Sequence, residues 1–214
     1  MRRVLVTGFE PFGGETTNPS ADAAALLPSQ LDGASIITAT LPVAYGQALP
    51  ALEGLLAAHQ PHLVLCLGQA GGRSAITPER VAINVDDAPI ADNVGRQPID
   101  VPVVEEGPAA YFSTLPIKAI VATIRAEQIP TAVSNTAGTF LCNHVFYGLM
   151  HLVATQYPGT QAGFIHIPYA SAQVVDKPTI PSLTLEQIRD GLLATIRASL
   201  THSQDITLSD GTSH

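Results

Sequence analysis

Short apolar runs alternate with longer amphipathic stretches along most of the chain. Residues 3–7 are continuously apolar, residues 35–41 and 63–67 are rich in aliphatic side chains, and residues 163–167 form a similar run later in the chain. Runs of this length and composition predict strands. A strand that is apolar without alternation is typical of a parallel sheet whose two faces are both covered.

Helical spacing appears between these runs. Apolar side chains recur three and four positions apart in three stretches, which predicts amphipathic helices over residues 46–59, 116–128 and 184–200. Asn18 followed by Pro19 predicts a further helix start. Thr184 with Gln187 three positions later has the pattern of a capping box.

Strands that alternate with helices imply βαβ crossovers. The sequence therefore predicts an α/β fold, a single-domain α/β/α sandwich around a mostly parallel, twisted central sheet. Residues 1–201 would form this one domain, and the polar residues 202–214 would form a flexible tail. Residues 74–108 are the exception, because they have little helical period, and such a segment is usually functional or an excursion such as a hairpin.

Composition narrows the classes of function. Of the 214 residues 46% are hydrophobic and 13% charged, and the net charge is −8 without any cluster of Lys and Arg. This balance argues against nucleic acid and anionic membranes as partners. No apolar stretch reaches the roughly 18 residues of a membrane span, and the first run stops at Glu10, too short for a signal peptide. We expect a cytoplasmic protein whose two cysteines form no disulfide framework.

One cysteine lies where a reactive thiol would be placed. The β-prone residues 131–133 lead into a small-residue loop, Cys142 follows, and an amphipathic helix then begins. A thiol at a helix start meets free backbone N–H groups and the positive end of the helix dipole, which both stabilise a thiolate. Cys66 lies within a buried strand and is predicted to be structural.

A base and an acid are needed beside such a thiol. His166 interrupts an apolar strand near its carboxyl end, whereas His144 is too close in sequence to face Cys142 across a cleft. A lone histidine in a strand is more often structural, but a partner thiol would reverse that preference. For the acid the residues alone leave a choice between Glu79 and the loop carboxylates, with Asp92 in reserve.

Several of these positions follow predicted strands. Phe9, Gln69, the Cys142 loop and His166 all lie at or just past strand ends, so in a parallel sheet they could share one edge. Cys and His also suggest zinc, but Cys142, His144 and His166 lack a recognisable ligand spacing. The paired glycines match neither a phosphate loop nor a dinucleotide motif. We therefore expect no metal and no cofactor.

At this point the chain resembles the pyroglutamyl peptidase I (pyrrolidone-carboxylate peptidase) family of cysteine peptidases. The similarity is carried by motifs spread in order over nearly the whole chain, at residues 6–14, 18–20, 76–84, 92–93, 97–98, 134–143 and 164–168. The resemblance implies a single α/β domain that removes N-terminal pyroglutamate (5-oxoproline) from peptides. It also implies a cytoplasmic homotetramer that uses no cofactor.

The resemblance assigns roles that spacing leaves open. It makes Cys142 the nucleophile, His166 the general acid and base, and Glu79 the carboxylate that orients the imidazole. It also places Phe9 and Phe12 as pocket walls, and it places three further residues near the ligand: Gln69, Phe140 and Leu141.

One departure from the family leaves alternatives open. The family commonly has an arginine and a proline where this chain has Pro89 and Ala91. The chain could therefore be a pyroglutamyl-binding protein with weakened catalysis. Another thiol amidase, such as a glutaminase, is the second alternative. The apolar excursion near residues 101–104 could be an interface between the subunits of an oligomer.

Overall fold

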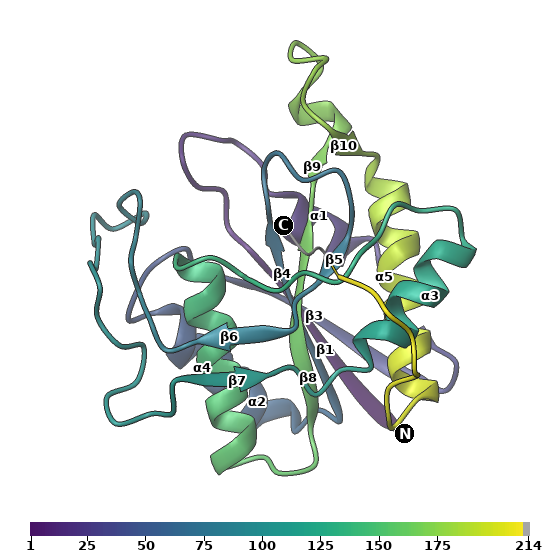
Figure 1. Ribbon diagram of the computed structural model, residues 1–214, viewed down its shortest axis with the longest axis horizontal. Coiled ribbons are helices and arrows are strands. Elements are labelled where there is room, and N and C mark those ends of the chain that lie inside the picture. Colours follow the sequence, from purple (N-terminus) through teal and green to yellow (C-terminus); the bar gives the residue numbers. More distant parts are fainter. Residues whose placement is uncertain (212–214) are drawn as a thin grey trace.

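A six-stranded sheet forms the centre of the computed structural model, which describes residues 1–211 (Figure 1). Four strands run parallel in the spatial order β3 (Ala34–Leu41), β1 (Arg2–Phe9), β4 (Leu63–Gln69) and β8 (Gln161–Ile167). The short strands β2 (Gln30–Leu31) and β5 (Thr77–Pro78) pair antiparallel at the two edges. The mostly parallel sheet expected from the apolar runs is confirmed.

Helices cover both faces of the sheet. On one face lie α1 (Pro19–Ala25), α3 (Ile117–Ala126) and α5 (Leu185–Thr201), and on the other lie α2 (Ala48–His59) and α4 (Leu141–Thr155). Figure 1 shows α3 and α5 on one side of the strands and α2 and α4 on the opposite side. The α/β/α sandwich is therefore confirmed.

The pattern of β4 shows why its sequence is apolar without alternation. Leu63, Leu65 and Leu67 belong to the core beneath α1, α3 and α5, whereas Val64 and Cys66 belong to the core beneath α2 and α4. All five side chains are at most 1% exposed. Full burial of such a side chain contributes about 1.5–3 kcal/mol, so both faces stabilise the strand.

The expected helix caps are confirmed. Asn18 Oδ1 accepts a hydrogen bond from the backbone N–H of Ser20, and Pro19 occupies the first turn of α1. At the start of α5 the Thr184 hydroxyl accepts from Gln187 N, and the Gln187 side chain accepts from Thr184 N.

The strand predicted over residues 131–133 is wrong. Only two isolated bridges join this segment to its neighbour, between Ile76 and Thr131 and between Glu79 and Ser134. The ladder is interrupted because Pro78, in the neighbouring segment, has no backbone N–H to donate. The N–H of Val133 points away from that neighbour and donates to the Asp210 carboxylate at 2.9 Å.

The long irregular segment is an excursion, as expected. β6 (Val81–Ile83) pairs antiparallel with β7 (Ala110–Phe112), and the chain between them projects from the sheet (Figure 1). A second projection contains β9 (Tyr169–Ala170), the short 3₁₀ helix η1 (Ser171–Gln173) and β10 (Ser182–Leu183).

The tail after α5 lies against the domain as far as it is described. The Asp205 carboxylate accepts from the backbone N–H groups of Lys118 and Ala119, which begin α3 after Pro116. Asp210 bonds Val133 and pairs with Arg125 at 2.7 Å. These two aspartates attach the segment that the sequence predicts to be flexible. Residues 212–214, which the same prediction covers, lie outside the described residues.

Within residues 1–211 no helix combines the length and the apolar character needed to cross a membrane.

Candidate active site

The carboxyl ends of three parallel strands meet the start of α4 at one edge of the sheet. Phe9 ends β1, Gln69 ends β4, and His166 lies near the end of β8, where it pairs with Gly68. Cys142 is the second residue of α4. The expectation that these residues share one edge is confirmed.

Gly68 gives the thiol its space. A Cβ atom added to Gly68 would lie 2.8 Å from Cys142 Sγ and 2.7 Å from the Phe164 ring. The sulfur therefore lies directly over the end of β4. His166 is the neighbour of Gly68 in the sheet, and the centroids of the Phe164 and His166 rings are 5.0 Å apart. The thiol and the imidazole therefore lie on the same side of the sheet, at the carboxyl ends of β4 and β8.

A buried carboxylate holds the imidazole. Glu79 Oε1 lies 2.7 Å from His166 Nδ1, and the two residues are 0% and 4% exposed. The antiparallel pairing of β5 with β8 places Thr77 beside His166, and the backbone N–H of Glu79 donates to Phe164 O. These contacts hold Glu79 alongside β8, where its side chain reaches His166. With Nδ1 engaged, Nε2 is the nitrogen available to the thiol.

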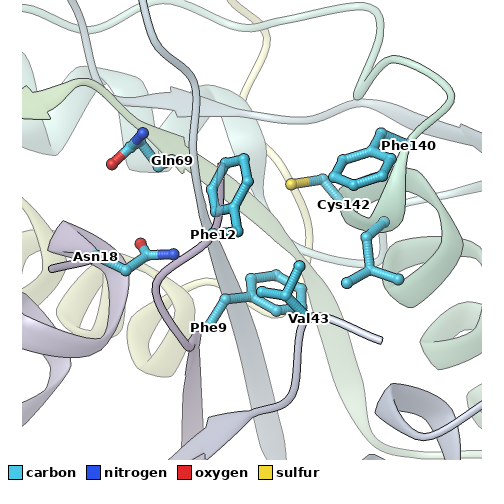
Figure 2. A pocket seen from close by; sticks show the side chains of 8 residues that line it. Phe9, Phe12, Asn18, Val43, Gln69, Phe140 and Cys142 are labelled. Atoms are coloured by element: carbon cyan, nitrogen blue, oxygen red, sulfur yellow. The ribbon is translucent and has the colours of Figure 1, made fainter. Parts of the chain in front are cut away.

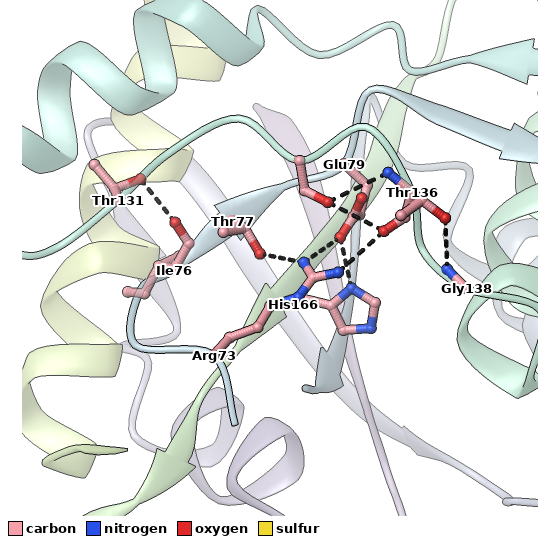
Figure 3. A network of polar contacts seen from close by, with 9 residues as sticks. Arg73, Ile76, Thr77, Glu79, Thr131, Thr136, Gly138 and His166 are labelled. Carbon is pink, nitrogen blue, oxygen red and sulfur yellow. Dashed lines mark hydrogen bonds and ion pairs between the residues drawn. The ribbon is translucent and has the colours of Figure 1, made fainter. Parts of the chain in front are cut away.

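Arg73 joins this pair, although the sequence analysis does not single it out. Arg73 Nη1 lies 2.7 Å from Glu79 Oε1 and 2.7 Å from Thr77 Oγ1, and Nη2 donates to Thr136 O at 3.0 Å. Figure 3 shows the guanidinium between Glu79 and the Thr136 loop. The only available signal is that Arg73 follows two glycines just after a strand.

Burial sets the resting protonation of the thiol and the imidazole. Burial, together with a smaller effect of the Glu79 charge, raises the pKa of Cys142 to about 12, and Arg73 opposes this rise. Burial also lowers the pKa of His166, while Glu79 opposes the fall. Both shifts favour the uncharged form of the group, which differs from the thiolate expected at the helix start.

A small cavity opens beside Cys142. The structure brings all the predicted pocket residues together around it: Phe9, Phe12, Gln69, Phe140 and Leu141. In Figure 2 the rings of Phe12 and Phe140 stand on either side of the sulfur, and their centroids are 6.3 Å apart. Most of the residues that line this cavity are apolar, which suits a small uncharged group.

Two further lining residues, Asn18 and Val43, were missed as pocket residues. Asn18 Oδ1 accepts from the backbone and the hydroxyl of Ser20, and that hydroxyl accepts from Phe9 N. The residue predicted only as a helix cap therefore also fixes the Phe9 loop.

The amide of Gln69 has a fixed orientation. Gln173 Nε2 donates to Gln69 Oε1 at 3.1 Å, and Gln173 Oε1 accepts from Ala170 N at 2.9 Å. The Gln69 N–H groups have no acceptor among residues 1–211 and remain available to a ligand.

Asp92, the reserve acid, serves its own loop. Its two oxygens accept from the backbone N–H groups of Tyr45, Val94 and Arg96. Burial acts to raise the pKa of Asp92, but the three hydrogen bonds outweigh burial and hold that pKa below its usual range. His166 takes Glu79 as its partner, as the resemblance implies.

Nowhere in residues 1–211 do three or more His, Cys, Asp or Glu side chains gather in a way that could hold a metal ion.

Known proteins match this chain over almost its full length. The family model described as pyroglutamyl peptidase matches residues 2–202. The pyrrolidone-carboxylate peptidase of Streptomyces coelicolor is 54% identical and covers 100% of both chains. The crystal structure of pyroglutamyl peptidase I from Bacillus amyloliquefaciens superposes with a TM-score of 0.94 at 47% identity, over 97% of this chain and 99% of that one. Pyrrolidone carboxyl peptidase from Thermococcus litoralis gives a TM-score of 0.94 at 39% identity, over 98% and 100%.

Proposed function

We propose, since this chain belongs to the pyroglutamyl peptidase family of cysteine peptidases, that it hydrolyses the bond after an N-terminal pyroglutamyl residue through a thioester on Cys142. The observation that carries this proposal is the position of Cys142, which lies at once on the wall of an aromatic cavity and beside the buried Glu79–His166 pair.

The cavity has the chemistry that a pyroglutamyl group requires. This group is a flat, neutral lactam without a free amine, and the lining residues include aromatic rings but no carboxylate that could hold an α-ammonium group. Phe12 and Phe140 would enclose the ring, and Gln69 would donate to its carbonyl oxygen. Because a prolyl ring lacks this carbonyl, it would leave the Gln69 N–H groups without an acceptor, which supports strong discrimination.

Acylation begins with the thiol. The proton of Cys142 moves to His166 Nε2, and the sulfur attacks the pyroglutamyl carbonyl carbon. The negative oxygen that results lies at the start of α4, where Phe140 supplies no side-chain cap and the backbone N–H of Cys142 is free to donate. The C–N bond then breaks as His166 returns the proton to the leaving amine, which leaves a thioester.

Deacylation repeats these moves with water. His166 takes a proton from water, the hydroxide attacks the thioester carbon, and the thiolate leaves and is reprotonated by His166. Glu79 accepts from His166 Nδ1 throughout, so it keeps Nε2 directed at the reacting groups and stabilises the imidazolium that forms.

The proposal also covers the cellular compartment, the oligomeric state and the use of cofactors. We place the enzyme in the cytoplasm as a homotetramer, with no cofactor in its reaction. Support for an interface comes from apolar side chains on the excursion: Ile99, Val101 and Phe112 are 60%, 42% and 69% exposed. Light scattering on the wild type and on Phe112→Ser tests this assembly, and a monomeric wild type would refute it.

A weakened binding protein is the alternative that the departure at Pro89 favours. The loop that contains Pro89 borders the cavity, because Asn93 N donates to Val43 O and Asn93 Nδ2 donates to Pro11 O. A binding protein would retain pyroglutamate but not react at Cys142. The complete Cys142–His166–Glu79 set supports the enzyme over this alternative.

The test compares the two cysteines. Wild type and Cys66→Ala should release coumarin from pyroglutamyl-aminomethylcoumarin, whereas Cys142→Ala should be inactive, and prolyl and glutaminyl analogues should react poorly. Turnover by Cys142→Ala would overturn the mechanism. Equal turnover of the glutaminyl analogue would identify a broader thiol amidase.

A further inference from the structure

Arg73 contacts the catalytic pair and the nucleophile loop at the same time. One guanidinium nitrogen, Nη1, reaches Glu79 Oε1 and Thr77 Oγ1, each at 2.7 Å, and the other, Nη2, reaches Thr136 O at 3.0 Å (Figure 3). Glu79 follows β5, whereas Thr136 lies in the loop that leads to Cys142. A single side chain therefore joins the two segments whose relative position the reaction depends on.

The charge of Arg73 compensates a buried carboxylate. Glu79 is 0% exposed, its Oε1 takes both His166 Nδ1 and Arg73 Nη1, and its Oε2 is buried with no hydrogen-bond partner among the described residues. A buried carboxylate destabilises the fold unless a cation lies beside it. His166 is not that cation in the resting site, because burial lowers the pKa of His166.

The Thr136 contact extends this support to the loop before Cys142. Thr136 O accepts from the Ser134 hydroxyl as well as from Arg73, and the Thr136 hydroxyl accepts from Gly138 N. Glu79 and Ser134 are also joined by a backbone bridge. Loss of the guanidinium would therefore loosen this loop on the side that faces Glu79.

Arg73 does not border the cavity that would hold substrate. It lies on the wall of a separate groove, formed by residues 72–77 and 132–136, and its side chain is 30% exposed there. The residues around the cavity are Phe9, Phe12, Asn18, Val43, Gln69, Phe140, Leu141 and Cys142. Any effect of Arg73 on turnover must therefore pass through the groups that it contacts.

We propose that Arg73 is a positioning residue for the hydrolysis, which holds Glu79 against His166 and fixes the Thr136 loop that leads to Cys142. This inference rests on the proposed roles of Cys142, His166 and Glu79. A purely structural ion pair would affect folding stability and leave the chemistry of the thiol unchanged.

Arg73→Gln tests the proposal by steady-state kinetics on pyroglutamyl-aminomethylcoumarin. We expect kcat to fall about 10- to 100-fold with KM within twofold, because a displacement of about 1 Å in a catalytic group has an effect of that size. Arg73→Lys should recover part of kcat, since it restores the charge but not the two-nitrogen contact. The matched control is Arg80→Gln: Arg80 adjoins Glu79 and bonds Asn135 in the same loop, and it does not contact the carboxylate.

Alkylation of the thiol gives a readout that a structural role would not move. Arg73 lowers the pKa values of both Cys142 and His166. In a Cys66→Ala background, Arg73→Gln should therefore slow the reaction of Cys142 with iodoacetamide and move the acid limb of the pH–rate profile to higher pH. Unchanged kcat, alkylation rate and pH profile, with only a lower melting temperature, would overturn the proposal.

A double-mutant cycle keeps the test valid even if Arg73→Gln folds poorly with its carboxylate unpaired. Arg73→Gln combined with Glu79→Gln removes both charges, and it should be no slower than Glu79→Gln alone if Arg73 acts through Glu79. Multiplied losses would overturn the route through Glu79 and would assign the effect of Arg73 to its contact with Thr136 O. Cys142→Ala separates the two levels: turnover by this variant refutes the proposed function, whereas an inactive Cys142→Ala with a fully active Arg73→Gln refutes only the role of Arg73.

Discussion

The molecule contains two buried histidine–carboxylate pairs that look almost the same. His166 Nδ1 lies 2.7 Å from Glu79, and His144 Nδ1 lies 2.7 Å from Asp86. The two histidines are 4% and 7% exposed, and the two carboxylates 0% and 4%. In each carboxylate the second oxygen is buried without a hydrogen-bond partner within the described residues.

The pairs differ in what lies beyond them. The His166 pair lies next to Cys142 and its cavity, and its carboxylate, Glu79, also pairs with Arg73. Nε2 of His144 is instead buried without a partner among residues 1–211, and the ring packs edge-on against Tyr45 at 5.0 Å. A histidine–carboxylate pair is thus a structural unit in itself, and it becomes catalytic only where Nε2 can reach a nucleophile.

Removal of each imidazole should give the largest contrast. His166→Ala should lower kcat/KM about 10³- to 10⁴-fold with little change in melting temperature, because the thiol loses its base. His144→Ala should retain kcat but destabilise the fold by about 3 kcal/mol, because it leaves Asp86 buried and unpaired. Steady-state kinetics and thermal unfolding measure the two effects. Loss of turnover in a well-folded His144→Ala would show that the second pair takes part in the reaction.

This contrast also shows where sequence reasoning works. His166 and Cys142 could be found because each lies at an apolar strand end or helix start, and parallel strands bring such ends to one edge. His144 was excluded only by its closeness to Cys142 in the chain. No pattern in the sequence indicates the buried pair that His144 forms with Asp86.

The acid and its cation could not be derived in this way. Glu79 reaches His166 through β5, a strand of two residues with no periodic signal, so only the family resemblance favoured it over Asp92. Arg73 was missed because its partners lie four, six and 63 positions away, and no pattern of residue types relates them. Gln173, 104 positions from Gln69, was missed for the same reason.

Small changes of volume should separate the two regions next. Gly68→Ala would bring a methyl group to 2.8 Å from Cys142 Sγ and should lower kcat about 100-fold by displacing the sulfur. Gly46 lies beside the His144 pair and has φ +78°, so Gly46→Ala should destabilise the fold by about 1–2 kcal/mol and leave kcat unchanged. Kinetics and chemical denaturation of both variants provide the comparison. Normal alkylation and turnover in Gly68→Ala would contradict the close approach of thiol and β4.

The smallest expected effect is in the pH dependence, and it assigns the acid limb to one of the two pairs. Burial holds the pKa of His166 below its usual 6.5, so the imidazole is neutral and able to accept the thiol proton above that pH. kcat/KM should therefore be flat from about pH 6.5 to 8 and fall as the pH drops through the lowered pKa of His166. Burial raises the pKa of Cys142 to about 12, so no rise in rate from thiolate formation should appear near pH 8–9.

Asp86→Asn, which changes only the second pair, should leave this profile where it is, because His144 does not exchange a proton with Cys142. A shift of the acid limb in Asp86→Asn, or a rise in rate near pH 8–9 in the wild type, would show that the division between a catalytic and a structural pair is drawn in the wrong place.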